Sequence, residues 1–202
     1  MCPGLSTDLT YIDDVRKTAV IDAELNRLNI DIAGLQETRL SEEGSLRENH
    51  YTFFWKGRGQ KEKRQHGVGF AVKNSLLGMI EIPAGGSERI LSLRMATSCG
   101  FATIITAYAP TLTSSDDVKD SFYGQLDAVI KAVPKSDHIY MLGDFNARVG
   151  KDSSSWPVCL GKYNIGRMND NGQRLLEHCT RNDLCITNIC VFFQIKERHK
   201  VT

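Results

Sequence analysis

Three short polar segments each follow an apolar, strand-like segment, and they carry the side chains best suited to chemistry. They are Gln36-Glu37-Thr38, Tyr108-Ala109-Pro110-Thr111 and Gly143-Asp144-Phe145-Asn146-Ala147. Strand ends project side chains from a rigid frame into a shared cleft, which is the arrangement that a preorganised site requires. Glu37, Asp144 and Asn146 offer hard carboxylate and amide oxygens, the ligands that suit Mg²⁺ or Mn²⁺. The pattern therefore indicates a site for a divalent cation and a phosphate.

Asp144 and Asn146 are two residues apart, so a strictly extended chain would turn both side chains to the same side. One of them could then position a water molecule while the other holds a phosphate oxygen. Each residue also has an ordinary structural explanation. A glutamate after a strand is often a helix cap or a solvated loop residue, Gly-Asp-x-Asn is often a turn, and Tyr108 would usually be a core tyrosine. The functional interpretation therefore depends on the occurrence of all three polar segments in one chain, each after an apolar strand.

Five basic residues gather in a glycine-containing loop between two predicted strands. They are Lys56, Arg58, Lys61, Lys63 and Arg64, which surround a single acidic residue, Glu62. Such a loop could contact the phosphate backbone of DNA and give a local foothold that salt weakens. It could equally be the solvated tip of a hairpin, and the sequence leaves both interpretations open.

The elements that must position these residues follow from the hydrophobic pattern. Helices are predicted over residues 16–28, 116–133 and 172–181, and strands over 30–36, 51–55, 67–72, 90–95, 101–108, 138–142 and 184–187. The predicted apolar faces are Thr18, Ile21, Leu25 and Leu28 in the first helix, and Val118, Phe122, Leu126, Val129 and Val133 in the second. Consecutive strands interrupted by crossover helices indicate an α/β fold of stacked mixed sheets flanked by helices.

Composition narrows the class of protein. The chain has 202 residues, enough for one domain with a sizeable core, and its 41% hydrophobic and 24% charged residues are typical of a globular protein. No apolar run approaches the ~20 residues that span a bilayer, and the first residues lack the pattern of a secretory signal, so we expect an intracellular protein without a membrane segment. With 25 Lys+Arg against 24 Asp+Glu, it cannot coat nucleic acid by bulk charge, and any phosphate-binding surface must be local.

Cysteine and histidine offer little further chemistry. The six cysteines form no C-x-x-C pair, and without a secretory signal a disulfide framework is not expected. We interpret them as reduced and mostly buried. The five histidines are interpreted as surface or structural residues.

The motifs Q-E-T-R at 36–39, A-Y-A-P at 107–110 and G-D-F-N-A at 143–147 resemble the signature of the endonuclease/exonuclease/phosphatase superfamily. More narrowly, the segments 29–33, 66–72 and 171–176 resemble the endonuclease domain of non-LTR (LINE-type) retrotransposons and the craniofacial development protein 2-like family. The resemblance covers nearly the whole chain. It implies that residues 1–202 form a four-layer α/β sandwich that acts on DNA by Mg²⁺-dependent (or Mn²⁺-dependent) hydrolysis of phosphodiesters, and we expect a monomer.

The resemblance also implies a role for each motif residue. Glu37 matches the metal-binding glutamate, and Tyr108 matches the tyrosine that hydrogen-bonds the region of the scissile phosphate. Asp144 matches the aspartate that positions or deprotonates the attacking water, and Asn146 the asparagine that orients the phosphate. A metal and hydrogen-bond donors that neutralise charge on phosphate oxygens agree with this assignment.

The sequence departs from the family pattern at both ends. That pattern begins with a strand ending in Asn-Val-Arg and closes with an Asp-Tyr strand and a later Asp-His pair, and this chain has neither; no Ser-Asp precedes His199. We therefore expect a sandwich truncated at both ends, lacking the first strand and the last strand pair, with weak or no nicking activity. One alternative is an inactive, retroelement-derived interaction module or a fragment with no stable function. Another, disfavoured by the retrotransposon resemblance, is a phosphatase of inositol phosphates or a lipid phosphodiesterase.

Overall fold

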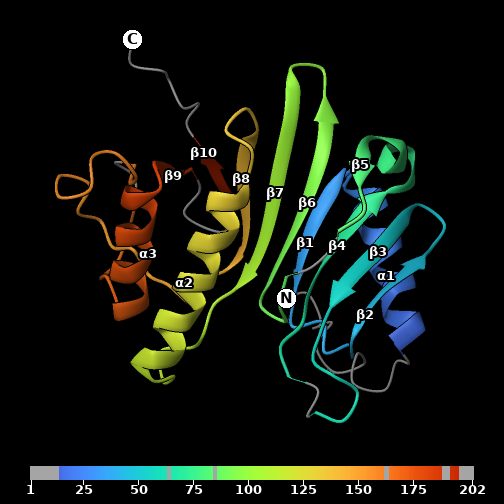
Figure 1. The fold of residues 1–202 in the computed structure, drawn as a ribbon, viewed down its shortest axis with the longest axis horizontal. Coiled ribbons are helices and arrows are strands. Elements are labelled where there is room, and N and C mark those ends of the chain that lie inside the picture. The colour runs from blue at the N-terminus through green and yellow to red at the C-terminus, as the bar shows by residue number, and fades with distance from the viewer. Residues whose placement is uncertain (1–13, 63–64, 84–85, 162–163, 188–191, 196–202) are drawn as a thin grey trace, which may run out of the picture.

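The computed structural model describes residues 14–62, 65–83, 86–161, 164–187 and 192–195. Two β-sheets pack face to face, and helices cover both outer faces (Figure 1). This arrangement confirms the predicted four-layer α/β sandwich. Within these ranges, no helix is both long enough and apolar enough to cross a membrane.

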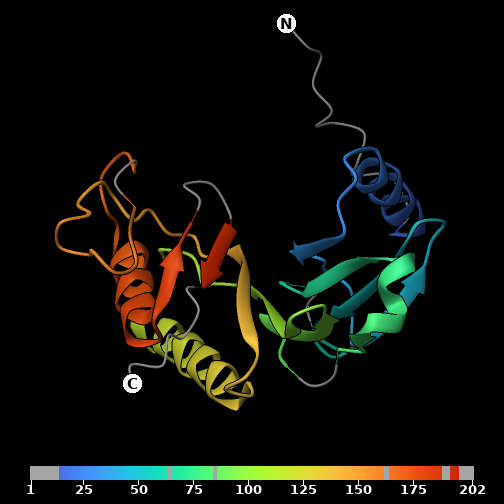
Figure 2. The same cartoon turned by 90° about the horizontal axis from the view of Figure 1, so that it is seen from above.

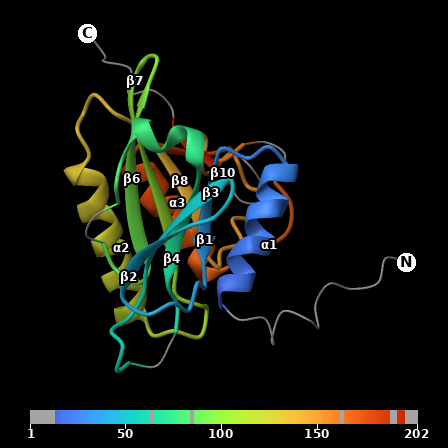
Figure 3. The ribbon, with the colours of Figure 1, turned by 90° about the vertical axis from the view of Figure 1, so that its right-hand side faces the viewer.

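The first sheet is antiparallel throughout its described strands. It consists of β1 (Ile32–Gln36), β2 (Glu43–Arg47), β3 (Tyr51–Lys56) and β4 (Val68–Lys73) in the order β1-β4-β3-β2. Helix α1 (Asp14–Arg27) lies alongside this sheet on its outer side (Figures 2 and 3). The small core beneath the helix contains Tyr51, Phe53 and Ala71, with Leu25 of α1 packed against them.

The second sheet is mixed, and its one parallel pair matters most for the site. Its strands are β5 (Ile80–Glu81), β6 (Ile90–Thr97), β7 (Gly100–Tyr108), β8 (His138–Asp144), β9 (Leu184–Ile186) and β10 (Phe192–Ile195), in the order β5-β6-β7-β8-β10-β9. Among the described strand pairs of this sheet, β7 and β8 are the pair that runs parallel, because helix α2 (Asp116–Ala132) crosses over the outer face between them. Helix α3 (Asp170–Arg181) lies beside α2 on that face (Figure 1).

Two larger cores hold the layers together. Between the sheets, Phe54, Val68, Phe70, Val72, Leu91, Leu93, Ile104 and Tyr108 form one cluster. Under α2 and α3, a second cluster includes Ile105, Phe122, Leu126, Met141 and Leu176. Strand residues therefore bury side chains on both faces of the second sheet, as expected for a sheet covered on both sides.

The predicted elements are confirmed apart from shifts of one or two residues at their ends, whereas three short strands were missed. Strand β2 is polar, and its burial alternates between exposed and half-buried. Strand β5 has only two residues, and β10 has four. The polar sequence of β2 and the two residues of β5 offer no hydrophobic periodicity to recognise, and all three strands form because a longer neighbour offers backbone hydrogen bonds.

The predicted apolar face of α2 is wrong at one position. Val118 is 45% exposed, whereas Lys119 is 5% exposed and lies on the inward stripe with Phe122, Leu126 and Ile130. The lysine is buried because its ammonium group lies 2.8 Å from the Asp170 carboxylate at the start of α3. A buried charge is tolerated where it is paired in this way.

The predicted apolar face of α1 is wrong in the same manner. Ile21 and Leu28 are exposed, and among residues 17–27 of the helix, whose burial is described, the buried one is Asp22. Its Oδ1 accepts the backbone N–H groups of His50 (2.9 Å) and Tyr51 (2.8 Å). These charge-assisted bonds offset the desolvation of the carboxylate and attach the helix to the start of β3.

Four of the six cysteines lie in the described ranges, and none of the four forms a disulfide. Cys159 and Cys179 are buried, Cys185 is half-buried and Cys99 is exposed. Cys2 and Cys190 lie outside the described residues. The interpretation of reduced cysteines therefore agrees with the four that can be seen, although only two of them are buried.

Candidate active site

Glu37 and Tyr108 meet directly at the end of the sandwich where β1 and β7 finish. The Tyr108 Oη donates to Glu37 Oε1 at 2.7 Å, and Arg39 Nη2 lies 2.9 Å from Glu37 Oε2. The hydrogen bond from Tyr108 and then that from Arg39 lower the pKa of Glu37 below its ordinary value. Burial, followed by the bond to Glu37, raises the pKa of Tyr108 to about 12. The pair is therefore an ionised carboxylate and a protonated phenol at neutral pH.

Asp144 lies next to this pair because of strand register. The parallel pairing of β7 and β8 places Tyr108 opposite Asp144, and the backbone N–H of Ala109 donates to the Asp144 carbonyl at 2.8 Å. The Asp144 side chain is exposed, and its Oδ1 accepts the backbone N–H of Asn146 at 2.8 Å. A carboxylate has two oxygens, so the second remains for water or substrate.

Asn146 follows in a turn, so the condition of an extended chain from Asp144 to Asn146 is not met. Asn146 has φ 49°, and the bond from its N–H to the Asp144 side chain closes the turn. Its side-chain Nδ2 donates to the Ala109 carbonyl at 2.9 Å. An amide nitrogen carries two hydrogens, so the second can still reach a phosphate oxygen.

Backbone strain gathers at this end of the fold. Glu37 (φ 52°), Arg39 (φ 54°), His66 (φ 65°) and Asn146 (φ 49°) are non-glycine residues in the left-handed region. Each such residue costs of the order of 1–3 kcal/mol and persists only where its surroundings hold it. The sequence pattern contained no signal for this strain, because it follows from how the loops are tied together.

His66 and Arg89 belong to the site, and the sequence analysis missed both. Arg89 Nη1 donates to the Tyr108 carbonyl at 3.1 Å, and Nη2 lies 3.0 Å from His66 Nε2. The His66 ring lies 5.8 Å from the Tyr108 ring. Burial and then the Arg89 charge lower the pKa of His66, so the imidazole is neutral at pH 7. Because guanidinium can only donate, His66 Nε2 accepts and Nδ1 carries the proton.

A sequence signal for these two residues did exist. His66 stands just before β4 and Arg89 just before β6, and these strands run antiparallel to β1 and β7. In an antiparallel pair, the start of one strand lies beside the end of the other. Polar residues before such strands therefore reach the same end of the sheet as Glu37 and Tyr108.

The basic loop borders this site, but the two cations whose partners are known are already paired. Lys56 Nζ lies 2.7 Å from Glu43 Oε2, and Arg58 Nη2 lies 3.5 Å from Glu88 Oε1. Lys61 is exposed, and Lys63 and Arg64 lie outside the described residues. The loop leads into His66, whose carbonyl accepts the Arg39 N–H at 2.9 Å. A contact of the loop with DNA stays a prediction.

Tyr108→Phe is expected to raise the pKa of Glu37 toward its ordinary value. The substitution removes the hydrogen bond that contributes most to stabilising the carboxylate form. NMR titration of the glutamate carboxyl carbons measures the change. Tyr140→Phe, which alters a half-buried tyrosine on the neighbouring strand β8, should leave the Glu37 titration in place. A Glu37 pKa that is the same in both variants would contradict this account.

The carboxylate at this site fits a Mg²⁺ ion whose coordination shell is completed by water and by the phosphate of the substrate. In the described part of the chain, no group of three or more His, Cys, Asp or Glu side chains is placed to hold a metal ion. Mg²⁺ keeps several of its waters, however, and is usually held by one or two carboxylates together with substrate phosphates. Glu37, ionised and half-exposed, offers such a carboxylate.

Comparison with known proteins identifies the family. The profile of the endonuclease/exonuclease/phosphatase family matches residues 9–189, a range that contains all three polar motifs. Craniofacial development protein 2 of Bos taurus is 33% identical over 187 residues, which make up 92% of this chain and 30% of that protein. The protein of the same name from Tragulus javanicus is 32% identical over 187 residues, 92% of this chain and 31% of its own. The chain thus spans under a third of these curated relatives.

A solved structure shows the same fold. The endonuclease domain of TRAS1, a telomere-specific non-LTR retrotransposon, matches with a TM-score of 0.57 and 15% sequence identity, over 89% of this chain and 80% of that one. At this identity the likeness concerns the fold alone. Together with the family profile, it shows that the chain belongs to the endonuclease/exonuclease/phosphatase family.

Proposed function

We propose that this chain, as a single domain over residues 1–202, is a metal-dependent DNA endonuclease of the retrotransposon type. The observation that carries the proposal is the bond between Tyr108 and the ionised Glu37 directly beside Asp144. Membership of a family of nucleases and phosphatases supports hydrolysis of a phosphate ester. The fold likeness to the TRAS1 endonuclease domain supports DNA as the substrate.

In this proposal four of the chain's own residues, Asp144, Asn146, Tyr108 and Arg89, have separate roles. Asp144, exposed and with one carboxylate oxygen uncommitted, accepts the proton of the attacking water. Asn146 donates its second amide N–H to a non-bridging phosphate oxygen. Tyr108 stays protonated and keeps Glu37 in place. Arg89, half-buried behind Tyr108, adds positive charge near the phosphate.

Glu37 is the residue that would hold the metal ion. A bound Mg²⁺ supplies positive charge next to the phosphate oxygens on which negative charge develops during hydrolysis. The Tyr108 bond leaves Glu37 Oε1 one further lone pair, and the Arg39 contact holds Oε2. These contacts fix the direction in which the carboxylate faces, as a metal ligand requires.

An inactive interaction module is the second candidate. The observation that favours it is that the described residues bring no three metal-ligating side chains together. A module of this kind would bind DNA or another partner with the same affinity in the presence and absence of Mg²⁺. The test of nicking separates the two candidates.

The test is nicking of supercoiled plasmid by the purified chain in Mg²⁺. We expect weak nicking that EDTA abolishes and that Glu37→Gln lowers by about 10²–10³-fold, because the metal loses its carboxylate. Glu177→Gln makes the same charge change at an exposed position on α3 and should leave the rate within twofold. Nicking that is equal in Glu37→Gln and the unchanged chain would overturn the metal-binding role of Glu37. Nicking that is absent from both would overturn the proposal in favour of the inactive module.

The basic loop provides a test of DNA as the partner. Replacing Lys56, Arg58, Lys61, Lys63 and Arg64 by glutamine is expected to weaken DNA binding and to flatten the plot of log affinity against log salt. For every phosphate that the loop no longer neutralises, the slope should fall by about 0.7–0.9. Fluorescence anisotropy with a labelled duplex measures both quantities. The same slope before and after substitution would show that the loop is a solvated hairpin tip.

A further inference from the structure

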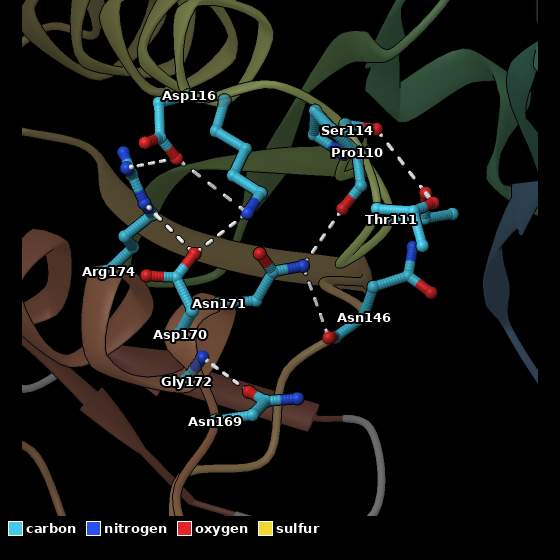
Figure 4. Close-up of polar contacts among 12 residues, drawn as sticks. Pro110, Thr111, Ser114, Asp116, Asn146, Asn169, Asp170, Asn171, Gly172 and Arg174 are labelled. Carbon is cyan, nitrogen blue, oxygen red and sulfur yellow. Dashed lines mark hydrogen bonds and ion pairs between the residues drawn. The ribbon is translucent and has the colours of Figure 1, made fainter.

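Asn171 is a buried amide that lies between two loops of the candidate site (Figure 4). Its Nδ2 donates to the Pro110 carbonyl at 2.9 Å and to the Asn146 carbonyl at 3.2 Å. Both hydrogens of the amide nitrogen are thereby used. Pro110 follows Tyr108 by two residues and Asn146 follows Asp144 by two, so one side chain joins the loops that leave the parallel strands β7 and β8.

The contact reaches the strained residue itself. Asn146 has a left-handed backbone, and three hydrogen bonds surround it. Its N–H donates to Asp144 Oδ1, its side chain donates to the Ala109 carbonyl, and its own carbonyl accepts from Asn171. A non-glycine residue in this conformation is retained only where such contacts hold it. Asn171 supplies the one of these bonds that comes from outside the two loops.

The start of α3, which carries Asn171, is fixed to the chain that follows Asn146. The Oδ1 of Asn169 accepts the N–H groups of Gly172 (2.8 Å) and Arg148 (2.9 Å), and the Asn169 N–H donates to the Arg148 carbonyl at 3.0 Å. A Cβ at Gly172 would lie 1.9 Å from that carbonyl oxygen, so only glycine permits this approach. The helix start and the site loop thus move together.

The same helix start is also tied to α2. Asp170 accepts from the buried Lys119 Nζ at 2.8 Å, and Arg174 Nη2 lies 3.0 Å from Asp116 Oδ1 (Figure 4). Lys119 and Asp116 belong to the first turns of α2, which itself follows the Tyr108 loop. The start of α3, which carries Asn171, is therefore bonded both to the chain that follows Asn146 and to α2.

In the described residues the Asn171 side chain makes its hydrogen bonds through Nδ2. Over the ranges that the structure describes, the buried Oδ1 of Asn171 accepts no hydrogen bond. A buried acceptor without a partner is unfavourable, so the favourable contribution of this side chain comes from its donor group. The two bonds made by Nδ2 are what the side chain contributes.

We propose that Asn171 is a positioning residue for the reaction: it fixes the loop of Asp144 and Asn146 relative to the loop of Tyr108. The inference rests on the proposed function, since it concerns the same site. Without the two Nδ2 hydrogen bonds the two loops can separate. Asp144, the general base, and Asn146, the donor to the phosphate, are then displaced from Tyr108.

Nicking kinetics test the proposal against a matched control. Asn171→Ala should lower kcat by about 10²-fold with KM within threefold, because misplacement of about 1 Å is enough for such a loss. Asn182→Ala removes a comparable amide at the other end of α3, where Nδ2 donates to Asp127 and to the His178 carbonyl, and should leave kcat within twofold. Asn171→Leu keeps nearly the same shape without the donors and replaces the alanine variant if that one does not fold. Equal kcat values for the substitutions at 171 and 182 would overturn the proposal.

Amide hydrogen exchange provides a readout that does not need activity. The Asn146 N–H, bonded to Asp144 Oδ1, should exchange at least about tenfold faster in Asn171→Ala than in Asn182→Ala, because the turn opens more often. Equal exchange in the two variants would overturn the positioning role. Absence of nicking by the unchanged chain would instead refute the proposed function, and the exchange comparison would still decide the role of Asn171.

Discussion

Asp144→Asn is expected to lower the rate of Mg²⁺-dependent DNA nicking by about 10²–10⁴-fold, the contribution typical of a general base. The substitution keeps the shape of the side chain and its Oδ1, which accepts the Asn146 N–H and closes the turn. It removes the oxygen that would take a proton from water. The loop therefore stays in place while the chemistry is lost, and single-turnover nicking of a supercoiled plasmid measures the rate.

Asp117→Asn serves as the control for this change. Asp117 is an exposed carboxylate in the first turn of α2, so its substitution alters the net charge equally. DNA binding measured by anisotropy should be the same in both variants, and nicking should fall only in Asp144→Asn. A rate for Asp144→Asn within tenfold of the unchanged chain would show that another group activates the water.

Gly143→Ala is expected to destabilise the protein by about 3 kcal/mol or more, the sum of backbone strain and a steric overlap. Gly143 has φ 150°, and a Cβ there would lie 2.0 Å from the Ala107 carbonyl oxygen on the neighbouring strand. Ala107 and Gly143 are paired in the parallel ladder immediately before Tyr108 and Asp144. An alanine therefore forces β7 and β8 apart at the site, and urea unfolding measures the loss of stability.

Gly124→Ala is the matched control, because the same chemical change is made in open space. Gly124 lies exposed within α2, and no heavy atom outside its own helix lies within 4 Å of the added Cβ. Alanine favours a helix over glycine by about 0.5–1 kcal/mol, so this variant should be slightly more stable than the unchanged chain. If Gly143→Ala were as stable as Gly124→Ala, close contact between the two strands would not be what requires glycine.

The effects expected of Asp144→Asn and Gly143→Ala both depend on the pairing of β7 with β8. The parallel pair β7 and β8 carries Tyr108 and Asp144 at equivalent positions, so an error of one residue in register would separate them by a strand step of about 3.3 Å. Glycine at 143 and the crossover through α2 set that register. The site thus depends on packing in the second sheet as much as on the polar residues themselves.

The local features of the fold and the site could be predicted from the amino-acid order alone. Apolar runs that end in polar motifs predicted the strands and placed Glu37, Tyr108, Asp144 and Asn146 at or just beyond strand ends, because hydrophobic periodicity and turn chemistry are properties of neighbouring residues. The same motifs indicated the family, which the profile over residues 9–189 shows.

Contacts between residues that are far apart in the chain could not be predicted in this way, because they follow from the three-dimensional packing. The burial of Asp22 and Lys119 depends on partners 28 and 51 residues away, so a helical pattern alone assigned their faces incorrectly. His66, Arg89 and Asn171 reach the site because antiparallel strands and the start of α3 bring them there. The energy of each such contact belongs to a pair of residues far apart in the chain, and no periodicity in either segment records it.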